Sequence, residues 1–218
     1  MVKGALARAS WQNKSMCGRA SQRGKREDFR NYVYQFDPQQ DLFRGNIKPT
    51  QDVPIVISDQ NEIKTVEARW WCQYDGAKEW STKYATFNAN ADRLESSPLW
   101  RNLVKTKRCI MPVTSFYEWP EKGKPPLEIT ANEGHPFALA GLWSNWYDNG
   151  EKKQSFAVIT TEANEFMKQY HRAMPVVLES KDLQKLWLLE GGMDVLRDFE
   201  CRLAGTRLPD KIEVVYAD

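Results

Sequence analysis

Histidine and paired cysteine are both scarce in this chain of 218 residues. It contains only two histidines, His135 and His171, and no two of its four cysteines form a Cys-x-x-Cys pair. Zinc sites draw mainly on clustered cysteine and histidine, so the sequence predicts no metal site, and nothing in it points to another cofactor. Four dispersed cysteines do not make a disulfide framework either, which favours a reducing compartment. The cysteines are Cys17, Cys72, Cys109 and Cys201.

Long apolar runs are also missing. No stretch approaches the length of a membrane span. Residues 1–15 contain basic and small residues and no acidic ones, but they lack the continuous apolar stretch of a secretory signal. Their composition resembles an organelle transit peptide, and a mis-assigned start or a removable pro-segment accounts for them equally well. We expect residues 1–16 to be a flexible leader that is absent from the active form, and 17–218 to be one domain.

Net charge is small but unevenly spread. The whole chain carries +2, whereas its first thirty residues carry +6, so the remainder carries −4. This balance excludes a generic polyanion binder. A basic first segment suggests local contact with phosphate, although a solvated surface explains the charge alone equally well. Nine tryptophans leave room for one or two stacking residues beyond the core.

Hydrophobic periodicity predicts a mixed α+β fold. Helices are expected at 24–36, 96–108 (with Ser97 as cap), 161–171, 180–189 and 192–201, and strands at 53–58, 61–72, 109–119, 135–148 and 154–163. The segment 73–92 is expected to be an extended loop. Helices and strands alternate without a βαβ rhythm. We therefore predict a single mixed domain with a central twisted or barrel-like β-sheet surrounded by short helices.

Three polar residues stand in unusual surroundings. Glu118 lies between aromatics in "FYEWP", where desolvation would raise its pKa and suit it to proton transfer. A salt-bridged structural glutamate explains it equally well, as a loop role explains Asn88 and a buried small hydrophobe explains Cys17. Cys17 follows Met16, however, and becomes the first residue if translation starts at Met16 and that methionine is removed, or if residues 1–16 are cleaved off.

Six segments considered together resemble the SRAP family, the SOS-response-associated peptidases. They occur in the family's order and cover the chain from Met16 to about Leu178. The segments are "MCGR" (16–19), "GNIKPTQDVPIV" (45–56), "FNANAD" (87–92), "RCIMPVTSFYEW" (108–119), "AGLW" (140–143) and "VITTEANEFMKQYHRAMPVVL" (158–178).

This resemblance implies a protein that shields abasic sites in single-stranded DNA by a covalent crosslink through an N-terminal cysteine. The chemistry of Cys17 agrees with this reaction. An α-amine condenses with the aldehyde of an opened abasic sugar, and the thiol of the same residue closes a thiazolidine ring. The amine titrates near ~8 and the thiol near ~8.5, so both are usable nucleophiles at neutral pH. An internal cysteine has only an amide nitrogen and could offer no more than a hemithioacetal.

The resemblance also assigns roles by matched position. Cys17 is the nucleophile, His171 assists ring opening and proton transfer, Glu118 moves protons, and Asn88 orients the aldehyde or ring oxygen. Gly18 leaves space for DNA, and Arg19 pairs with a phosphate. Trp80 would stack on a base beside the lesion, with core packing as the competing explanation. The expected DNA-binding residues are Gly18, Arg19, Asn46, Pro49, Trp80 and Arg172.

The chain departs from the family pattern at several positions. Asn90 and Ala173 stand where the family usually has arginine, Asp92 stands where glutamate is common, and "WWCQYDG" replaces "WGLIP". Fewer fixed cations would then hold the DNA backbone. We therefore expect weaker, more salt-sensitive binding than in a typical member.

Other functions stay open at this stage. The chain could be a cysteine-dependent self-processing peptidase with Glu118 or His171 as proton shuttle, or a non-catalytic module for single-stranded DNA. An abasic-site lyase side activity is compatible with an imine. The resemblance implies a monomer that contacts DNA and no membrane. It would be cytoplasmic and nucleoid-associated in a bacterium or phage, and nuclear otherwise.

Overall fold

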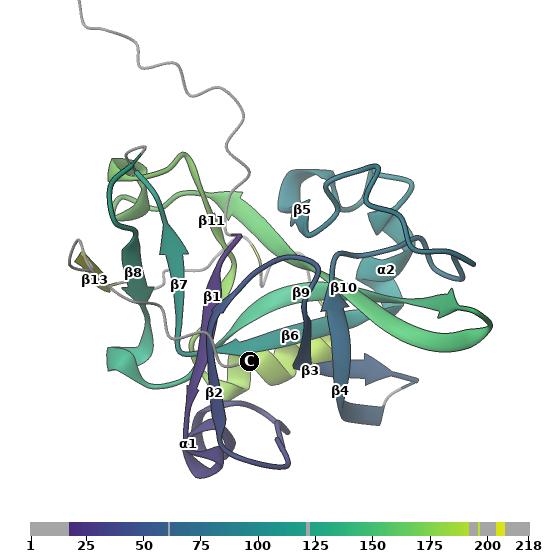
Figure 1. Cartoon of the computed structure of the whole chain (residues 1–218), viewed down its shortest axis with the longest axis horizontal. Coiled ribbons are helices and arrows are strands. Elements are labelled where there is room, and N and C mark those ends of the chain that lie inside the picture. Colours follow the sequence, from purple (N-terminus) through teal and green to yellow (C-terminus); the bar gives the residue numbers. More distant parts are fainter. Residues whose placement is uncertain (1–17, 61, 121–122, 192–195, 197–203, 208–218) are drawn as a thin grey trace, which may run out of the picture.

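The computed structural model describes residues 18–60, 62–120, 123–191, 196 and 204–207. The leader predicted at 1–16, Cys17 and most of the helix predicted at 192–201 lie outside the described residues. Figure 1 shows two sheets that meet side by side, with helices against one of them.

The larger sheet closes into a barrel. Its order is β11 (Ala173–Pro175), β10 (Glu151–Glu162), β4 (Glu62–Trp70), β3 (Asp52–Asp59), β6 (Arg108–Val113), β9 (Phe137–Asp148) and β12 (Val177–Leu178). Because β9 also pairs with β10, the five strands β10, β4, β3, β6 and β9 form a ring. A short strand, β5 (Asn88–Asn90), runs parallel to the end of β10.

The smaller sheet has five strands. Their order is β13 (Ala204–Arg207), β8 (Leu127–Thr130), β7 (Ser115–Glu118), β1 (Ala20–Gly24) and β2 (Leu42–Ile47). Only Thr114 separates β6 of the barrel from β7 of this sheet, so one continuous apolar segment joins the two sheets. The strand predicted at 109–119 is therefore two strands that belong to different sheets.

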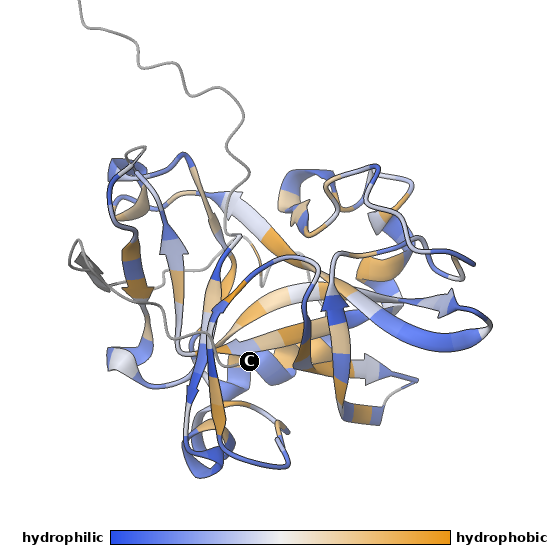
Figure 2. Ribbon diagram, in the orientation of Figure 1, coloured by the Kyte–Doolittle hydropathy of each residue, from blue (hydrophilic) through white to orange (hydrophobic). Residues whose placement is uncertain are grey.

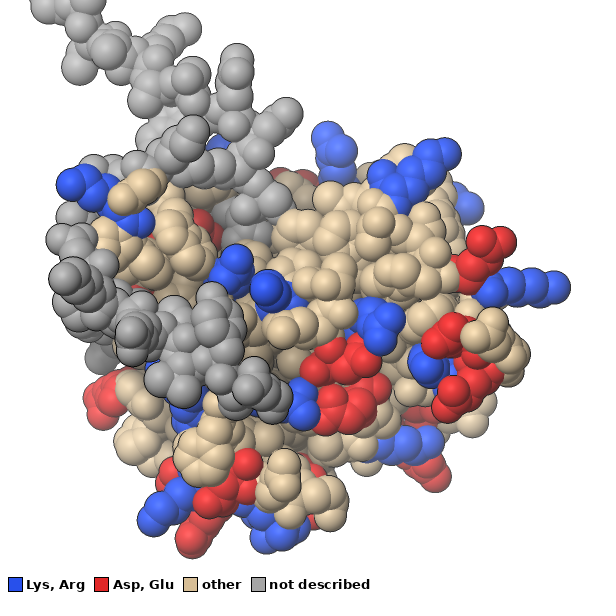
Figure 3. Space-filling model, viewed as in Figure 1, with Lys and Arg blue, Asp and Glu red and all other residues tan. Residues whose placement is uncertain are grey.

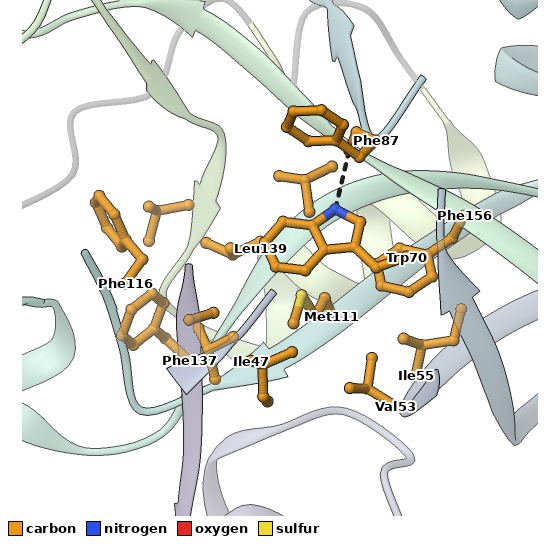
Figure 4. Packing of buried hydrophobic residues seen from close by; sticks show 14 of the residues in the cluster. Ile47, Val53, Ile55, Trp70, Phe87, Met111, Phe116, Phe137, Leu139 and Phe156 are labelled. Atoms are coloured by element: carbon orange, nitrogen blue, oxygen red, sulfur yellow. Dashed lines mark hydrogen bonds between the residues drawn. The ribbon is translucent and has the colours of Figure 1, made fainter. Parts of the chain in front are cut away.

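Alternate residues of the barrel strands form an inner cluster that joins the two sheets. It includes Ile55, Trp70, Met111 and Phe156 from the barrel and Phe116 from the smaller sheet. Figure 4 shows these side chains converging, with Trp70 Nε1 donating to the carbonyl oxygen of Phe87 at 2.9 Å. This bond fixes the residue before β5 against the core.

The intervening residues of the same strands form an outer cluster that the helices cover. Helix α1 (Arg26–Tyr32) contributes Phe29, α2 (Trp100–Thr106) contributes Trp100, and Trp187 comes from the π-helical turn η4 (Leu186–Glu190), which continues α3 (Lys181–Lys185). Orange apolar segments accordingly lie along the barrel strands in Figure 2, and hydrophilic residues occupy the exposed ends of the hairpins. The predicted α+β barrel-like domain is thus confirmed.

Several individual predictions are also confirmed. The strands predicted at 53–58 and 61–72 are β3 and β4, the helix at 24–36 forms over a shorter range, and the helix at 180–189 forms as α3 and η4. The strands predicted at 135–148 and 154–163 are β9 and β10, which form a hairpin with Asn149 and Gly150 at φ values of 50° and 87° in its turn. Both central residues of such a turn need positive φ, which asparagine and glycine tolerate best.

Three predictions are wrong. The segment 161–171 contains only the 3₁₀ turn η3 (Met167–Gln169), because Thr160–Glu162 pair with β11 and extend β10 instead. Ser97 does not cap α2, whose N-cap is Leu99 without a side-chain bond. The loop expected at 73–92 contains β5 near its end. The strands β1, β2 and β8 were not predicted.

Candidate functional site

The described chain begins with Gly18, directly after Cys17, and its path there is set by strand pairing. Ala20 of β1 lies opposite Phe116 of β7 in antiparallel register. The N–H of Tyr117 donates to the carbonyl oxygen of Arg19 at 3.0 Å, so the pairing continues beyond the formal start of β1. The same register brings Gly18 opposite Glu118. Figure 1 shows the start of β1 and the end of β7 at the same upper edge.

Glu118 is the last residue of β7 and is only 7% exposed. Side chains two apart on a strand share a face, so Glu118 lies on the same face as Phe116, which belongs to the inner cluster. Its carboxyl group therefore belongs to the side of β7 that faces the barrel. The burial expected from "FYEWP" is confirmed.

Asn88 approaches the same interior from the barrel. It pairs with Val158 of β10 in parallel register, and paired residues of neighbouring strands lie on the same face. Val158 belongs to the inner cluster, whereas the following pair, Ala89 and Ile159, belongs to the outer cluster. Asn88 and Glu118 thus lie on inward-facing sides of opposite sheets.

His171 lies between η3 and β11 and is half-buried. Its backbone N–H donates to the carbonyl oxygen of Met167 at 2.8 Å, and its ring Nδ1 accepts the N–H of Ala173 at 3.2 Å. The same Nδ1 lies 3.3 Å from the carbonyl oxygen of Ala173, so either tautomer of the ring finds a hydrogen-bond partner on this residue. Met167 and Met174, on either side of His171, belong to the inner cluster.

Arg19 follows Gly18 and is held by two side chains. Its Nη1 donates to Oδ1 of Asn46, and its Cζ lies 5.6 Å from the centroid of the Trp119 ring. Asn46 adopts a φ of 57°, which asparagine tolerates better than most residues. Pro49 follows in the turn closed by the bond from Gln51 N–H to the carbonyl of Lys48 at 3.2 Å.

Trp119 is a site residue that the sequence reasoning did not select. The available signal was its position directly after Glu118, but its contact with Arg19 depends on residues a hundred positions apart in the chain. Arg172, in contrast, was selected, and the structure leaves its side chain exposed next to His171.

Trp80 lies elsewhere in the fold. Its half-buried ring packs 5.0 Å from the ring of Trp146, and Cζ of Arg69 lies 5.0 Å from its centroid. Arg69 is also bonded to both oxygens of Asp52, at 2.7 and 2.9 Å. These contacts favour the packing explanation for Trp80, and its stacking on DNA stays a prediction.

The two substitutions at expected arginine positions have structural consequences. Oδ1 of Asn90 accepts the N–H of Asp92 at 2.8 Å and so caps the 3₁₀ turn η1 (Ala91–Arg93). Ala173 donates its N–H to the ring of His171, as described above. Asn90 therefore stabilises the chain locally where an arginine would reach outward.

The other described cysteines are poor nucleophiles. Burial raises the pKa of Cys72 to about 12 and raises the pKa of Cys109 well above its usual value. Reaction of either thiol at neutral pH is therefore suppressed. Cys201 lies outside the described residues.

Within the described part of the chain, no group of three or more His, Cys, Asp or Glu side chains is arranged to hold a metal ion. Over the same residues, no helix is long and apolar enough to cross a membrane.

Comparison with known proteins identifies several relatives. The sequence model of the SOS response associated peptidase (SRAP) family matches residues 16–202. The abasic site processing protein YoaM of Bacillus subtilis is 35% identical over 183 residues, covering 79% of each chain. The abasic site processing protein HMCES of Gallus gallus is 26% identical over 179 residues, covering 66% of this chain and 53% of that protein. A crystal structure of a Bordetella bronchiseptica protein superposes with a TM-score of 0.72 at 21% identity, covering 88% of this chain and all of that one.

Proposed function

Because the chain belongs to the SRAP family, we propose that it recognises abasic sites in single-stranded DNA and crosslinks to them through Cys17 as its N-terminal residue. The observation that carries this proposal is the pairing of β1 with β7. It holds the residue after Cys17 opposite the buried Glu118, on the side of the sheet that faces Asn88. The names of the relatives, which are abasic site processing proteins, support the substrate class.

The proposed reaction has two bond-forming steps. The α-amine of Cys17 attacks C1′ of the ring-opened sugar, and loss of one water gives an imine. The thiol of the same residue then adds across the C=N bond, its sulfur to carbon and its proton to nitrogen, which closes a five-membered thiazolidine. No oxidant, reductant or metal enters this balance.

Proton transfers in these steps fall to three side chains. Glu118, which the β1–β7 register holds opposite Gly18, takes a proton from the attacking amine and returns it to the departing water. His171 donates a proton to the sugar oxygen, and its ring is held in place by the contact of Nδ1 with the backbone nitrogen of Ala173 at 3.2 Å. Asn88 orients the aldehyde or ring oxygen through its amide.

Contacts with the DNA backbone come from the rim of this site. Arg19 has five N–H donors, of which Asn46 takes one, so several stay available for a phosphate next to the lesion. The exposed Arg172 supplies a second cation beside His171. Gly18 leaves room for the strand, since a Cβ built there meets nothing within 4 Å. Asn46 and Pro49 line the same rim, and Trp80 is the candidate stacking residue.

The test uses two forms of the chain, one beginning at Met1 and one at Met16, expressed in the native host. Intact mass first establishes which form begins at Cys17. Each form is then incubated with a single-stranded oligonucleotide that carries one abasic site, and adducts are resolved on a denaturing gel. Only protein that begins at Cys17 is expected to form the adduct. A verified Cys17 terminus that leaves the oligonucleotide unmodified contradicts the proposal.

Two variants separate chemistry from folding. Cys17→Ala removes the thiol and should abolish the stable adduct while single-stranded binding persists. Glu118→Gln keeps the size and polarity of the buried side chain but cannot shuttle a proton, so adduct formation should slow by about 100-fold or more at unchanged binding. If Cys17→Ala still forms the stable adduct, Cys17 is not the nucleophile and the proposal is wrong.

We also propose that the same geometry serves removal of the leader, since the Met16–Cys17 bond adjoins residue 18 opposite Glu118. In this reaction the Cys17 side chain attacks the preceding carbonyl, Glu118 transfers the proton, and water releases residues 1–16. The form that begins at Met1 should then lose its leader spontaneously, and Glu118→Gln should retain it, as measured by intact mass over time.

A further inference from the structure

The segment 71–87, here called the aromatic loop, joins β4 to β5 and is anchored firmly to the barrel. The carboxylate of Asp75 accepts bonds from Nζ of Lys107 at 2.8 Å and from the N–H of Asn145 at 3.0 Å. The carbonyl of Ala77 accepts the N–H of Tyr147 at 2.7 Å. These bonds attach the first half of the loop to the end of β9.

The second half of the loop is tied to the first by a buried amide. Gln73 is 5% exposed, and its Oε1 accepts the N–H of Ser81 at 3.1 Å while its Nε2 donates to the Ser81 carbonyl at 3.0 Å. Trp80 then packs on Arg69 and Trp146, as described for the site. The aromatic loop is therefore preorganised rather than loosely attached.

Two aromatic rings on this fixed loop are nevertheless left in solvent. Tyr74 is 57% exposed and Tyr84 is 61% exposed. The ammonium of Lys83 lies 5.4 Å from the centroid of the Tyr84 ring, so one cation sits on this ring. The bonds described above hold the loop in place without either ring. The two exposed rings therefore have no part in anchoring the loop.

Charge and position both suit a nucleic-acid strand. Lys78 and Lys83 are exposed beside the exposed Glu79, and Asp75 is paired with Lys107, so the loop presents no net negative charge. Tyr84 lies four residues before Asn88, and four residues span at most about 14 Å, which a few nucleotides of extended strand can cover. In Figure 3 the upper right region, where Figure 1 shows the loops around β5 and α2, is largely uncharged, with basic side chains along its top and both acidic and basic side chains at its right edge.

The opposite side of β5 is less suitable for a polyanion. A cavity of about 440 Å³ opens there, and its lining includes the carboxylates of Asp92, Glu95 and Glu162 against one cation, Lys168. Lys168 is already shared with Glu162 and Glu165. Phosphate would be repelled on that side, so a bound strand should leave the site over the aromatic loop.

We propose that Tyr84, with Lys83 on its ring, is a stacking platform for an unpaired nucleobase of the strand that flanks the lesion. This inference rests on the proposed function for its substrate and names a contact distinct from Trp80. A tyrosine face accepts any base, so the platform contributes affinity without sequence preference. Lys83 is close enough to the ring to pair with the phosphate of the stacked nucleotide.

The test measures binding without chemistry. The probe is a single-stranded oligonucleotide with a tetrahydrofuran abasic analogue, which has no aldehyde, flanked by the fluorescent base 2-aminopurine. Tyr84→Ala is expected to weaken binding by about 5- to 100-fold and to relieve the quenching of 2-aminopurine. Tyr84→Phe keeps the ring and should bind like the unmodified protein.

Phe43→Ala is the matched control, because Phe43 is 71% exposed but lies at the far end of β2, opposite Arg23. It should leave binding unchanged. Equal binding by Tyr84→Ala and the unmodified protein overturns the inference, as does equal loss in Tyr84→Ala and Tyr84→Phe. Failure to crosslink a true abasic oligonucleotide would refute the proposed function alone, because the analogue reports stacking independently.

Discussion

The backbone N–H of Tyr117 donates to the carbonyl oxygen of Arg19 at 3.0 Å, and the phenol of the same tyrosine ties three strands together behind this bond. Its hydroxyl lies 2.7 Å from Oγ of Ser21 and donates to Oε1 of Glu128 at 2.9 Å. These residues belong to β1, β7 and β8. One buried side chain thus stabilises the end of the smaller sheet that carries the candidate site.

Tyr117→Phe removes this hydroxyl and should lower the free energy of unfolding by about 1–2 kcal/mol, because Ser21 and Glu128 each lose a buried partner. Urea denaturation at pH 7 measures the change. Tyr84→Phe removes an exposed hydroxyl and should leave stability unaltered. Equal stability of the two variants would show that the buried network contributes nothing.

Gly141→Ala should be strongly destabilising. Gly141 belongs to β9, and a Cβ built there lies 2.7 Å from the carbonyl oxygen of Ala157 and 2.8 Å from Sγ of Cys109. The first contact is with backbone, so the barrel strands must move apart, at about 1–3 kcal/mol or more. Thermal unfolding provides the measurement. Gly18→Ala is the control, because its Cβ meets nothing within 4 Å and should leave the melting temperature unchanged while slowing adduct formation.

The pair formed by Asp75 and Lys107 should give a pH-dependent contribution to stability. Partial burial raises the pKa of Asp75, but the Lys107 hydrogen bond and the Asn145 N–H outweigh it, so the pKa lies below 3.8. The contribution is complete above the unfolded pKa and is lost as the pH falls through the lowered folded pKa. Asp75→Asn should therefore cost at most about 1 kcal/mol at pH 7, given the exposure of the pair.

Urea denaturation of both proteins at pH 7, 4 and 3 tests this dependence. The difference between the unmodified protein and Asp75→Asn should shrink toward pH 3. A difference that grows as the pH falls would contradict the assignment.

Asn90→Arg should strengthen single-stranded DNA binding at a cost in stability. An added cation next to β5 can contact one more phosphate, which steepens the dependence of log K on log salt by about 0.7. The lost cap of η1 should lower the unfolding free energy by about 0.5–2 kcal/mol. Asn90→Ala loses the cap without gaining charge and serves as control. By the same rule, the unmodified protein should bind DNA more weakly than a member with arginine there but with a shallower salt slope, so the expectation of greater salt sensitivity is revised to weaker binding alone.

Local sequence signals predict those elements whose own residues favour the observed structure. The Asn149–Gly150 turn and the apolar runs of β9 and β10 specify a hairpin without reference to the rest of the chain. The strands β1 and β8 give no such signal, because "ASQRG" and "LEIT" are short and become strands by pairing with distant partners, β7 and β2 for β1 and β7 and β13 for β8. The helix predicted at 161–171 fails for the same reason, since pairing of Thr160–Glu162 with β11 overrides local propensity.

Residue identities in the candidate site could be proposed from the order of motifs, but their geometry could not. The register of β1 on β7 and the contacts of the His171 ring with the backbone of Ala173 both depend on the folded backbone. Trp119 was missed because its contact with Arg19 is set by that register. Trp80 follows from the resemblance through its position before Asn88, and position in the sequence cannot separate a ring packed on Trp146 from a ring open to solvent.

Ser21 and its hydroxyl partner Tyr117 are 96 positions apart, so the ribosome synthesises Tyr117 well after Ser21. At roughly 5–20 residues per second, the amino end is outside the ribosome for about 5–20 s before its neighbouring strand exists. Throughout that interval Ala20 and Ser21 lack their partners on β7, so the amino-terminal end of β1 stays accessible to enzymes that act on nascent chains.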